Sequence, residues 1–257
     1  MYKNIFQRRE DKYLVHQGLC LNILNAIHQN FSYTSRQHYN IASTYFDNAE
    51  WMCYLNHIFK VEPRYKLRFR QYGDHEGFFK KGFLEIKEKD ALYTYKRRFR
   101  IHEEWIEDLS NENVIDGILD LNAASVSSSF PRTYQIIKHK IESDNLAPVL
   151  RVEYDRISFE KSDPFLRITF DSKLQFQKYN DRTTDSVSFN NEFMIMEIKT
   201  IEEEKPEWLL ELLRRYSIRK KSFSKYAVGV SLFYTPKYNA VPVLNDEPLD
   251  RVEVSYE

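Results

Sequence analysis

Charged side chains recur at every second position in several stretches whose composition predicts β-strands. In a strand, residues i, i+2 and i+4 point to the same face. Lys66, Arg68 and Arg70 therefore share one face, while Leu67 and Phe69 share the other. The same phase relates the residues of six further stretches: Arg8, Glu10 and Lys12; Glu85, Lys87 and Lys89; Lys96, Arg98 and Arg100; Tyr154 and Arg156; Arg167, Thr169 and Asp171; Glu197 and Lys199.

Two architectures can present charges in this way. Ordinary half-exposed strands place charges in water, which explains one or two such strands well. This architecture explains seven such strands poorly, because neighbouring like charges on a sheet repel each other. The pattern therefore favours an α+β fold: an eight-stranded antiparallel β-tunnel, closed as a barrel, with helices packed outside and the charged face lining the lumen. Such a lumen holds one ligand at most and suits a polyanion, because arginine and lysine both bind phosphate.

Hydrophobic periodicity divides the chain into alternating strand-rich and helical parts. Strands are predicted at 8–15, 39–47, 58–72, 78–89, 93–101, 147–159, 167–176 and 193–200, with a turn at 73–77. The stretch 58–72 is one strand or two, broken near Pro63. Helices are predicted at 18–31 and 51–56, and two or three more within 103–143, with a break at 125–131. A further helix begins at Pro206, and the stretch 222–234 is a loop that leads into a last helical segment. We expect a single domain over residues 1–235 and an extended tail over 236–257.

Composition excludes several classes of function. The 38 basic residues equal the 38 acidic residues, whereas a simple nucleic-acid binder has a basic excess. The chain contains six glycines and no glycine-rich phosphate motif, so side chains must hold any phosphate. No apolar stretch approaches the ~20 residues of a membrane span, and the N-terminus lacks a signal peptide's apolar core. We therefore expect a cytoplasmic protein without a membrane span of its own.

Three features leave structural and functional interpretations open. Glu197 lies between Met196 and Ile198, so its carboxylate needs an ion-pair partner or a metal if it is buried. Lys225, before an apolar stretch, is either a surface residue or a ligand contact. The basic run between 214 and 221 is either a solvated helix face or a rim that guides anions.

Short motifs along nearly the whole chain resemble those of one known family. The opening stretch 8–13 resembles R-x-E-x-K-Y, and 43–47 resembles S-x-Y-F-D. Further matches are K-x-R-x-R-x-Y at 66–72 and F-x-E-x-K at 83–87, then 96–99, 154–156, 167–171, 196–199 and 222–226. Together, in this order, they are similar to the triphosphate tunnel metalloenzyme superfamily. Within it, they resemble the catalytic domain of the vacuolar transporter chaperone (VTC) polyphosphate polymerases.

The resemblance implies ATP-dependent growth of inorganic polyphosphate in the tunnel, with Mn²⁺ or Mg²⁺. With the strand phase, it assigns catalytic roles to Arg68, Arg70, Lys87, Arg156, Arg167 and Lys225. Phosphate-binding roles go to Lys12, Lys66, Lys96, Arg98, Tyr154, Lys199 and Ser224. The expected metal ligand is Glu197, with Glu10 and Glu85 as second choices. The alternatives are a metal-dependent triphosphatase, acting on tripolyphosphate or a nucleoside triphosphate, and a non-catalytic polyphosphate sensor.

Two departures from the family pattern affect these expectations. Eukaryotic members often carry lysine where this chain has Ser222, so one phosphate contact is expected to be missing. The sequence also lacks their N-terminal phosphate-sensing domain and membrane helices. We therefore expect ATP and polyphosphate as ligands, no nucleic acid, and a separate membrane protein if the product is exported.

Overall fold

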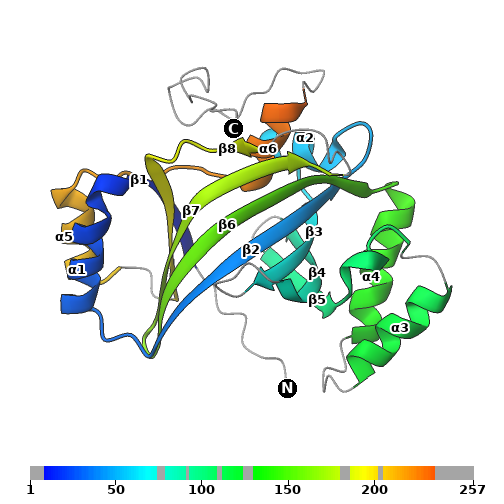
Figure 1. The fold of residues 1–257 in the computed structure, drawn as a ribbon, viewed down its shortest axis with the longest axis horizontal. Helices are drawn as coiled ribbons and strands as arrows, with labels where there is room; N and C mark the ends of the chain where they lie inside the picture. The colour runs from blue at the N-terminus through cyan, green and yellow to red at the C-terminus, as the bar shows by residue number, and fades with distance from the viewer. Residues whose placement is uncertain are drawn as a thin grey trace.

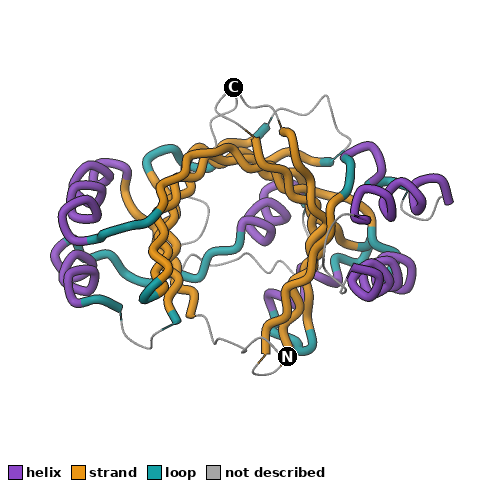
Figure 2. Tube along the Cα trace, turned by 90° about the horizontal axis from the view of Figure 1, so that it is seen from below, coloured by secondary structure: helices purple, strands orange, loops and turns teal. Residues whose placement is uncertain are grey.

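The strands form one antiparallel sheet that curves into an arch (Figure 2). The computed structural model describes residues 9–73, 79–90, 93–108, 112–123, 130–179, 186–201 and 205–234. The strand order is β1-β9-β7-β6-β2-β3-β4-β5, with β8 paired to β7. Their bounds are β1 Arg9–His16, β2 Ser35–Asp47, β3 Arg64–Gly73, β4 Phe79–Asp90, β5 Tyr93–Arg100, β6 Ala147–Ser162, β7 Phe165–Lys178, β8 Val187–Ser188 and β9 Phe193–Thr200.

The prediction of a closed barrel is not confirmed: in the described residues the sheet is open, with β1 and β5 at its edges. A segment before the last helix occupies the free edge of β1. Lys221 donates its backbone N–H to the Lys12 carbonyl at 2.8 Å, and Lys220 forms an isolated bridge with Tyr13. The backbone groups that would pair with a closing strand are thus partly used, and an edge covered in this way avoids open pairing.

Helices flank the arch on both sides (Figure 1). On one flank, α1 (Cys20–Asn30) and α5 (Glu207–Arg215) bury Ile23, Ile27 and Leu209 against the outer face of β1, β7 and β9. On the other, α3 (Glu112–Ala123) and α4 (Phe130–Ser143) pack beside β5. Short 3₁₀ turns cover Gln17–Leu19 and Glu103–Trp105. The helices therefore cover the apolar face of the sheet, as the alternation predicts.

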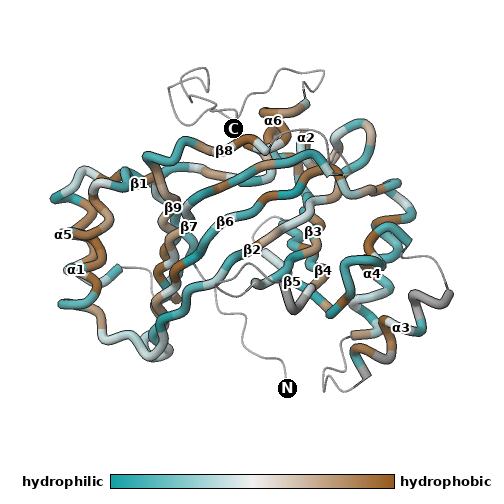
Figure 3. The backbone as a smooth tube through the Cα atoms, viewed as in Figure 1, coloured by the Kyte–Doolittle hydropathy of each residue, from teal (hydrophilic) through white to brown (hydrophobic). Residues whose placement is uncertain are grey.

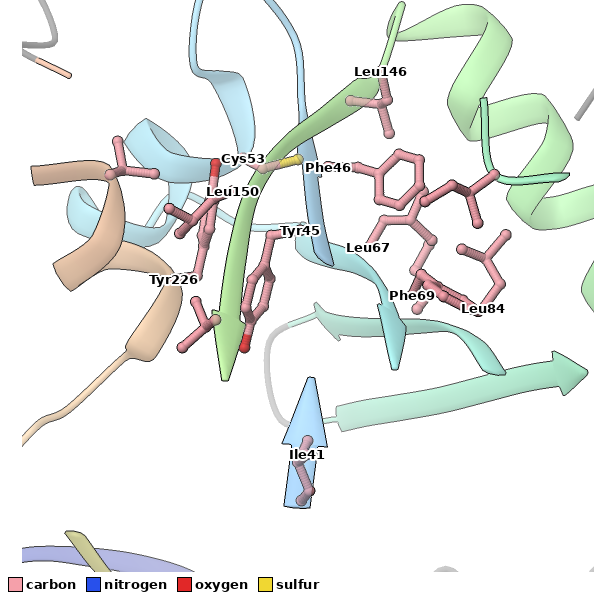
Figure 4. Packing of buried hydrophobic residues seen from close by; sticks show 14 of the residues in the cluster. Ile41, Tyr45, Phe46, Cys53, Leu67, Phe69, Leu84, Leu146, Leu150 and Tyr226 are labelled. Carbon is pink, nitrogen blue, oxygen red and sulfur yellow. The ribbon is translucent and has the colours of Figure 1, made fainter. Parts of the chain in front are cut away.

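Two helices instead fill one end of the arch from within: α2 (Met52–Ile58) and α6 (Lys225–Phe233). α6 is apolar over most of its length (Figure 3), and a Cβ on Gly229 would come within 2.4 Å of the Leu150 side chain. Leu150 shares the inner face of β6 with Tyr154 and Arg156 by strand phase. Figure 4 shows Leu150 beside Tyr226 of α6. The inner face thus changes from apolar under α6 to charged farther along β6.

The predicted elements agree with most of the observed ones, and their ends differ by a few residues. β2 begins at Ser35, and α2 ends at Ile58. The two-residue β8 was not predicted and brings the sheet to nine strands. The tail 236–257, Arg8, the turn residues 74–77 and the break residues 125–129 lie outside the described residues. No helix in the described ranges is long and apolar enough to cross a membrane.

Candidate functional site

The inner face of the arch encloses a cavity of about 2360 Å³ that contains every predicted site residue. Its lining is strongly cationic. Three glutamates, at positions 10, 85 and 197, face sixteen basic side chains: Arg9, Lys12, Arg64, Lys66, Arg68, Arg70, Lys87, Lys89, Lys96, Arg98, Arg156, Arg167, Lys199, Lys220, Lys221 and Lys225. Tyr154 and Ser224 also line the cavity. The strand phase therefore places the predicted residues around one space, while their roles stay a prediction.

Glu85, on β4, holds three cations of neighbouring strands. Arg68 donates to its Oε2 from Nε at 3.0 Å and Nη2 at 2.8 Å. Lys96 and Arg98 lie 2.9 and 3.5 Å from its Oε1. Burial alone would raise the pKa of Glu85, but Arg68, Arg70 and Lys96 hold it well below its usual range. This carboxylate is therefore occupied as a counter-ion and is poorly placed to take a metal.

Asp171, on β7, holds two cations from different parts of the chain. Arg156 donates to both of its oxygens, at 2.5 and 2.6 Å, and Lys225 donates to Oδ2 at 2.5 Å. Burial opposes ionisation, but Arg156 and then Lys225 lower the pKa of Asp171 to about 2. The carboxylate therefore stays charged and fixes Arg156 of β6 relative to the first residue of α6.

Glu10 and Glu197 form a two-carboxylate group on β1 and β9. Lys199 lies 3.3 Å from Glu10 and 3.0 Å from Glu197, and Lys12 lies 3.6 and 3.8 Å from them. Lys87 reaches Glu10 at 3.6 Å. Burial raises the pKa of Glu197, but Lys199, Lys12 and a hydrogen bond involving Glu10 hold it well below its usual range. Two carboxylates therefore share one side of the cavity among lysines.

The segment leading into α6 brings further polar groups into the same space. Ser224 caps α6, its Oγ accepting from the Ala227 backbone N–H at 3.3 Å. Lys66 donates to the same Oγ at 2.9 Å, and Lys12 donates to the Phe223 carbonyl at 3.1 Å. Burial, and then the neighbouring lysines, lower the pKa of Lys66 well below its usual range. A bound anion would relieve this cationic crowding.

Two arginines, the buried Arg70 and the half-buried Arg167, donate to hydroxyl groups. Arg70 donates to the Tyr154 hydroxyl at 2.9 Å and to Ser43 at 3.3 Å. Arg167 donates to the Tyr39 hydroxyl at 3.1 Å and to Ser158 at 3.2 Å. Hydroxyl oxygens orient a guanidinium without neutralising it, and Arg167 has a more distant carboxylate as well, Glu160 Oε2 at 3.6 Å.

Asp171 and His57 are among the residues of this site that the sequence did not indicate. Asp171 was placed in phase with Arg167, yet no motif indicated that it would join Arg156 to Lys225. His57, near the end of α2, lies in no motif of the sequence, yet it lines the cavity. Burial, and then Lys66 and Arg64, lower the pKa of His57 to about 3, so its imidazole is neutral.

The carboxylates fit a hard divalent cation only in part. Within the described ranges, no cluster of three or more His, Cys, Asp or Glu residues gathers as a metal site. Glu10 and Glu197 provide carboxylate oxygens on paired strands, Glu10 opposite Lys199 and Glu197 opposite Lys12, and Mg²⁺ is commonly held by one or two carboxylates plus substrate phosphates. The residues therefore fit a cation bound jointly with a polyphosphate ligand.

An antiparallel arch with a cationic inner cavity and helices outside defines the class of this fold. The VTC domain model matches residues 7–234, so the chain belongs to the VTC domain family. Among solved structures, a putative adenylyl cyclase from Hippeastrum, described as having a dominant triphosphatase activity, superposes with a TM-score of 0.50 at 17% identity. The match covers 86% of this chain and 94% of that one, and it supports the fold alone.

Curated relatives include subunit 4 of the vacuolar transporter chaperone complex from three organisms. The Trypanosoma cruzi protein is 28% identical over 93% of this chain and 36% of its own length. The Schizosaccharomyces pombe protein is 22% identical over 81% of this chain and 34% of its own length. The chain spans about a third of the length of these relatives.

Proposed function

We propose that this chain is a metal-dependent polyphosphate polymerase that transfers the γ-phosphoryl group of ATP to a growing inorganic polyphosphate chain. The observation that carries the proposal is the convergence of sixteen basic side chains and three glutamates in one cavity. Family membership adds support, since the curated relatives, which this chain matches over about a third of their length, are subunits of a vacuolar transporter chaperone complex. We place the reaction in the cytoplasm, where ATP is abundant, with a separate membrane protein for any export.

Binding would rest on the cations that the buried carboxylates and hydroxyls orient. Arg68, Arg70, Arg156 and Arg167 offer planar donor groups that match phosphate oxygens. Lys225 adds a point charge at the start of α6. Because these groups are fixed before the ligand arrives, little reorganisation is needed when it binds.

The transfer breaks the bond between the γ-phosphorus and the ADP oxygen and forms a bond to the terminal oxygen of the polyphosphate chain. Phosphoryl transfer depends mainly on alignment and on neutralising charge, so no covalent protein intermediate is required. A divalent cation held by Glu197, with Glu10 beside it, would neutralise charge on the phosphate oxygens. The lysines and arginines would keep donor and acceptor phosphates in line despite their mutual repulsion.

The test incubates the purified chain with ATP and Mn²⁺ and follows two products in parallel. Gel electrophoresis detects polymer, and a colorimetric assay detects free phosphate. The proposal predicts polymer and little free phosphate in the wild type, and neither product in Arg70→Ala. Arg97→Ala, on the opposite face of β5, is the matched control and should keep activity. Free phosphate without polymer would instead identify a triphosphatase. Neither product with any divalent metal would favour a sensor.

A further inference from the structure

Three aromatic side chains lie together on the cavity face of β2, β3 and β4, away from α6. The ring centroids of Tyr39 and Tyr72 are 5.8 Å apart, and those of Tyr72 and Phe83 are 6.2 Å apart. All three side chains are half-buried, and both tyrosines line the cavity. They form an aromatic wall inside a space whose lining is otherwise largely charged.

Two phosphate-binding candidates border this aromatic wall directly. Arg167 donates to the Tyr39 hydroxyl at 3.1 Å. The Arg98 guanidinium carbon lies 4.6 Å from the Phe83 ring centroid, and its side chain is 49% exposed. Aromatic and cationic surfaces are thus continuous, so a ligand with a flat apolar part and a polyanionic part could contact both.

The order of residues along β3 sets the direction of such a ligand. Tyr72, Arg70, Arg68 and Lys66 follow one another on the inner face, with steps of about 7 Å expected for alternate residues of a strand. Lys66 at the far end meets Ser224 of α6. A triphosphate lying along Arg70 and Arg68 with its terminal phosphate towards Ser224 would therefore place its other end at Tyr72.

Inorganic polyphosphate gains nothing from an aromatic wall, whereas a nucleobase does. Bases stack on tyrosine and phenylalanine rings and on arginine guanidinium planes. We propose that Tyr39, Tyr72 and Phe83, with Arg98, form a nucleobase subsite that lets this cavity distinguish a nucleoside triphosphate from inorganic triphosphate. The inference rests on the proposed function and names the contact that would select its phosphoryl donor.

The first experiment uses the wild type and needs no variant. Calorimetry at a fixed Mn²⁺ concentration compares ATP with ribose 5-triphosphate, which carries the triphosphate and sugar without a base. Stacking on a half-buried wall should make ATP bind about 5- to 10-fold more tightly. Equal affinities would overturn the subsite.

The second experiment separates the base contact from the phosphate contacts. Tyr72→Leu keeps apolar volume and removes the ring, so ATP affinity should fall about 5- to 10-fold while tripolyphosphate affinity stays within about twofold. Tyr72→Phe should restore ATP binding, and Tyr95→Leu, on the outer face of β5, should change neither ligand. An equal loss for ATP and tripolyphosphate would contradict the subsite. If the wild type binds neither ligand, the proposed function itself has failed.

Discussion

Lys87 and Glu10 meet across the cavity, with Nζ 3.6 Å from Oε2, although β4 and β1 lie near opposite ends of the strand order. Strand hydrogen bonds therefore do not bring the two ends of the sheet together at this point. An ion pair does so, and Lys199 and Lys12 share the same carboxylate. Glu10 thus acts as a counter-ion for three lysines from three strands.

Glu10→Gln removes this shared counter-ion while keeping the side-chain shape. Metal-free tripolyphosphate should bind about 3- to 10-fold more tightly, because three lysines lose a competing anion. Folding stability should change by less than about 1 kcal/mol, since the pairs are partly exposed. Calorimetry in a chelator measures the effect, with Glu153→Gln on the outer face as control. Weaker binding by Glu10→Gln would show that the carboxylate orients the lysines.

Glu197→Gln tests the metal assignment. Turnover with ATP and Mn²⁺ should fall about 100-fold, while metal-free tripolyphosphate binding stays within about threefold, because Lys199 and Lys12 remain. A chelator should reduce wild-type turnover similarly and have little further effect on the variant. Full metal-dependent turnover in Glu197→Gln would rule out this ligand and leave Glu10 as the better candidate.

Asp171→Asn should destabilise the protein and also weaken ligand binding. Leaving Arg156 and Lys225 without their buried partner should cost about 3–5 kcal/mol of unfolding free energy. Because the pKa of Asp171 is about 2 in the folded protein and about 3.9 in unfolded chains, its contribution is present above pH 4. It is lost as pH falls towards 2.

Denaturant unfolding at pH 7 and pH 3 measures this effect, and calorimetry measures tripolyphosphate affinity. The difference in stability between wild type and Asp171→Asn should shrink at the lower pH. If the variant is equally stable at pH 7 and binds tripolyphosphate more tightly, Asp171 only competes with the ligand.

Lys96 should make the binding of anions in the cavity weaker at alkaline pH. Burial lowers the pKa of Lys96 to about 8, against the opposing charge of Glu85. The ammonium therefore loses its proton as pH rises through 8, and tripolyphosphate affinity should fall about two- to fivefold between pH 7 and pH 9. Lys96→Arg keeps a charged group over this range, so its profile should be flatter. Identical profiles would place the titrating group elsewhere.

The residues of the inner face could be predicted from the sequence, because side chains alternate between the two faces of a strand with a period of two. Once Lys66, Arg68 and Arg70 are in a strand, they must share a face, and the cavity lining agrees. Partners distant in the sequence could not be predicted. Asp171 meets Lys225 only because α6 enters the arch, and Glu85 is surrounded by cations only because β3, β4 and β5 pair in one register.

Closure of the sheet could not be predicted for a similar reason. The alternation of each strand fixes which side chains face inward, but it does not specify which backbone segment pairs with each edge. Here Lys221 bonds to the Lys12 carbonyl on the free side of β1, an interaction between residues about 200 positions apart. Non-local pairing of this kind depends on the whole fold.

Isotopic labelling follows the γ-phosphoryl group of ATP and shows whether it enters polyphosphate. The chain is incubated with Mn²⁺ and ATP labelled with ³²P at either the γ- or the α-phosphate, and the polymer is separated by gel. If the γ-phosphoryl group is transferred, label should enter polymer from γ-labelled ATP only, with one ADP formed per phosphate incorporated. Label released only as free phosphate, or α-label in the polymer, would contradict this transfer.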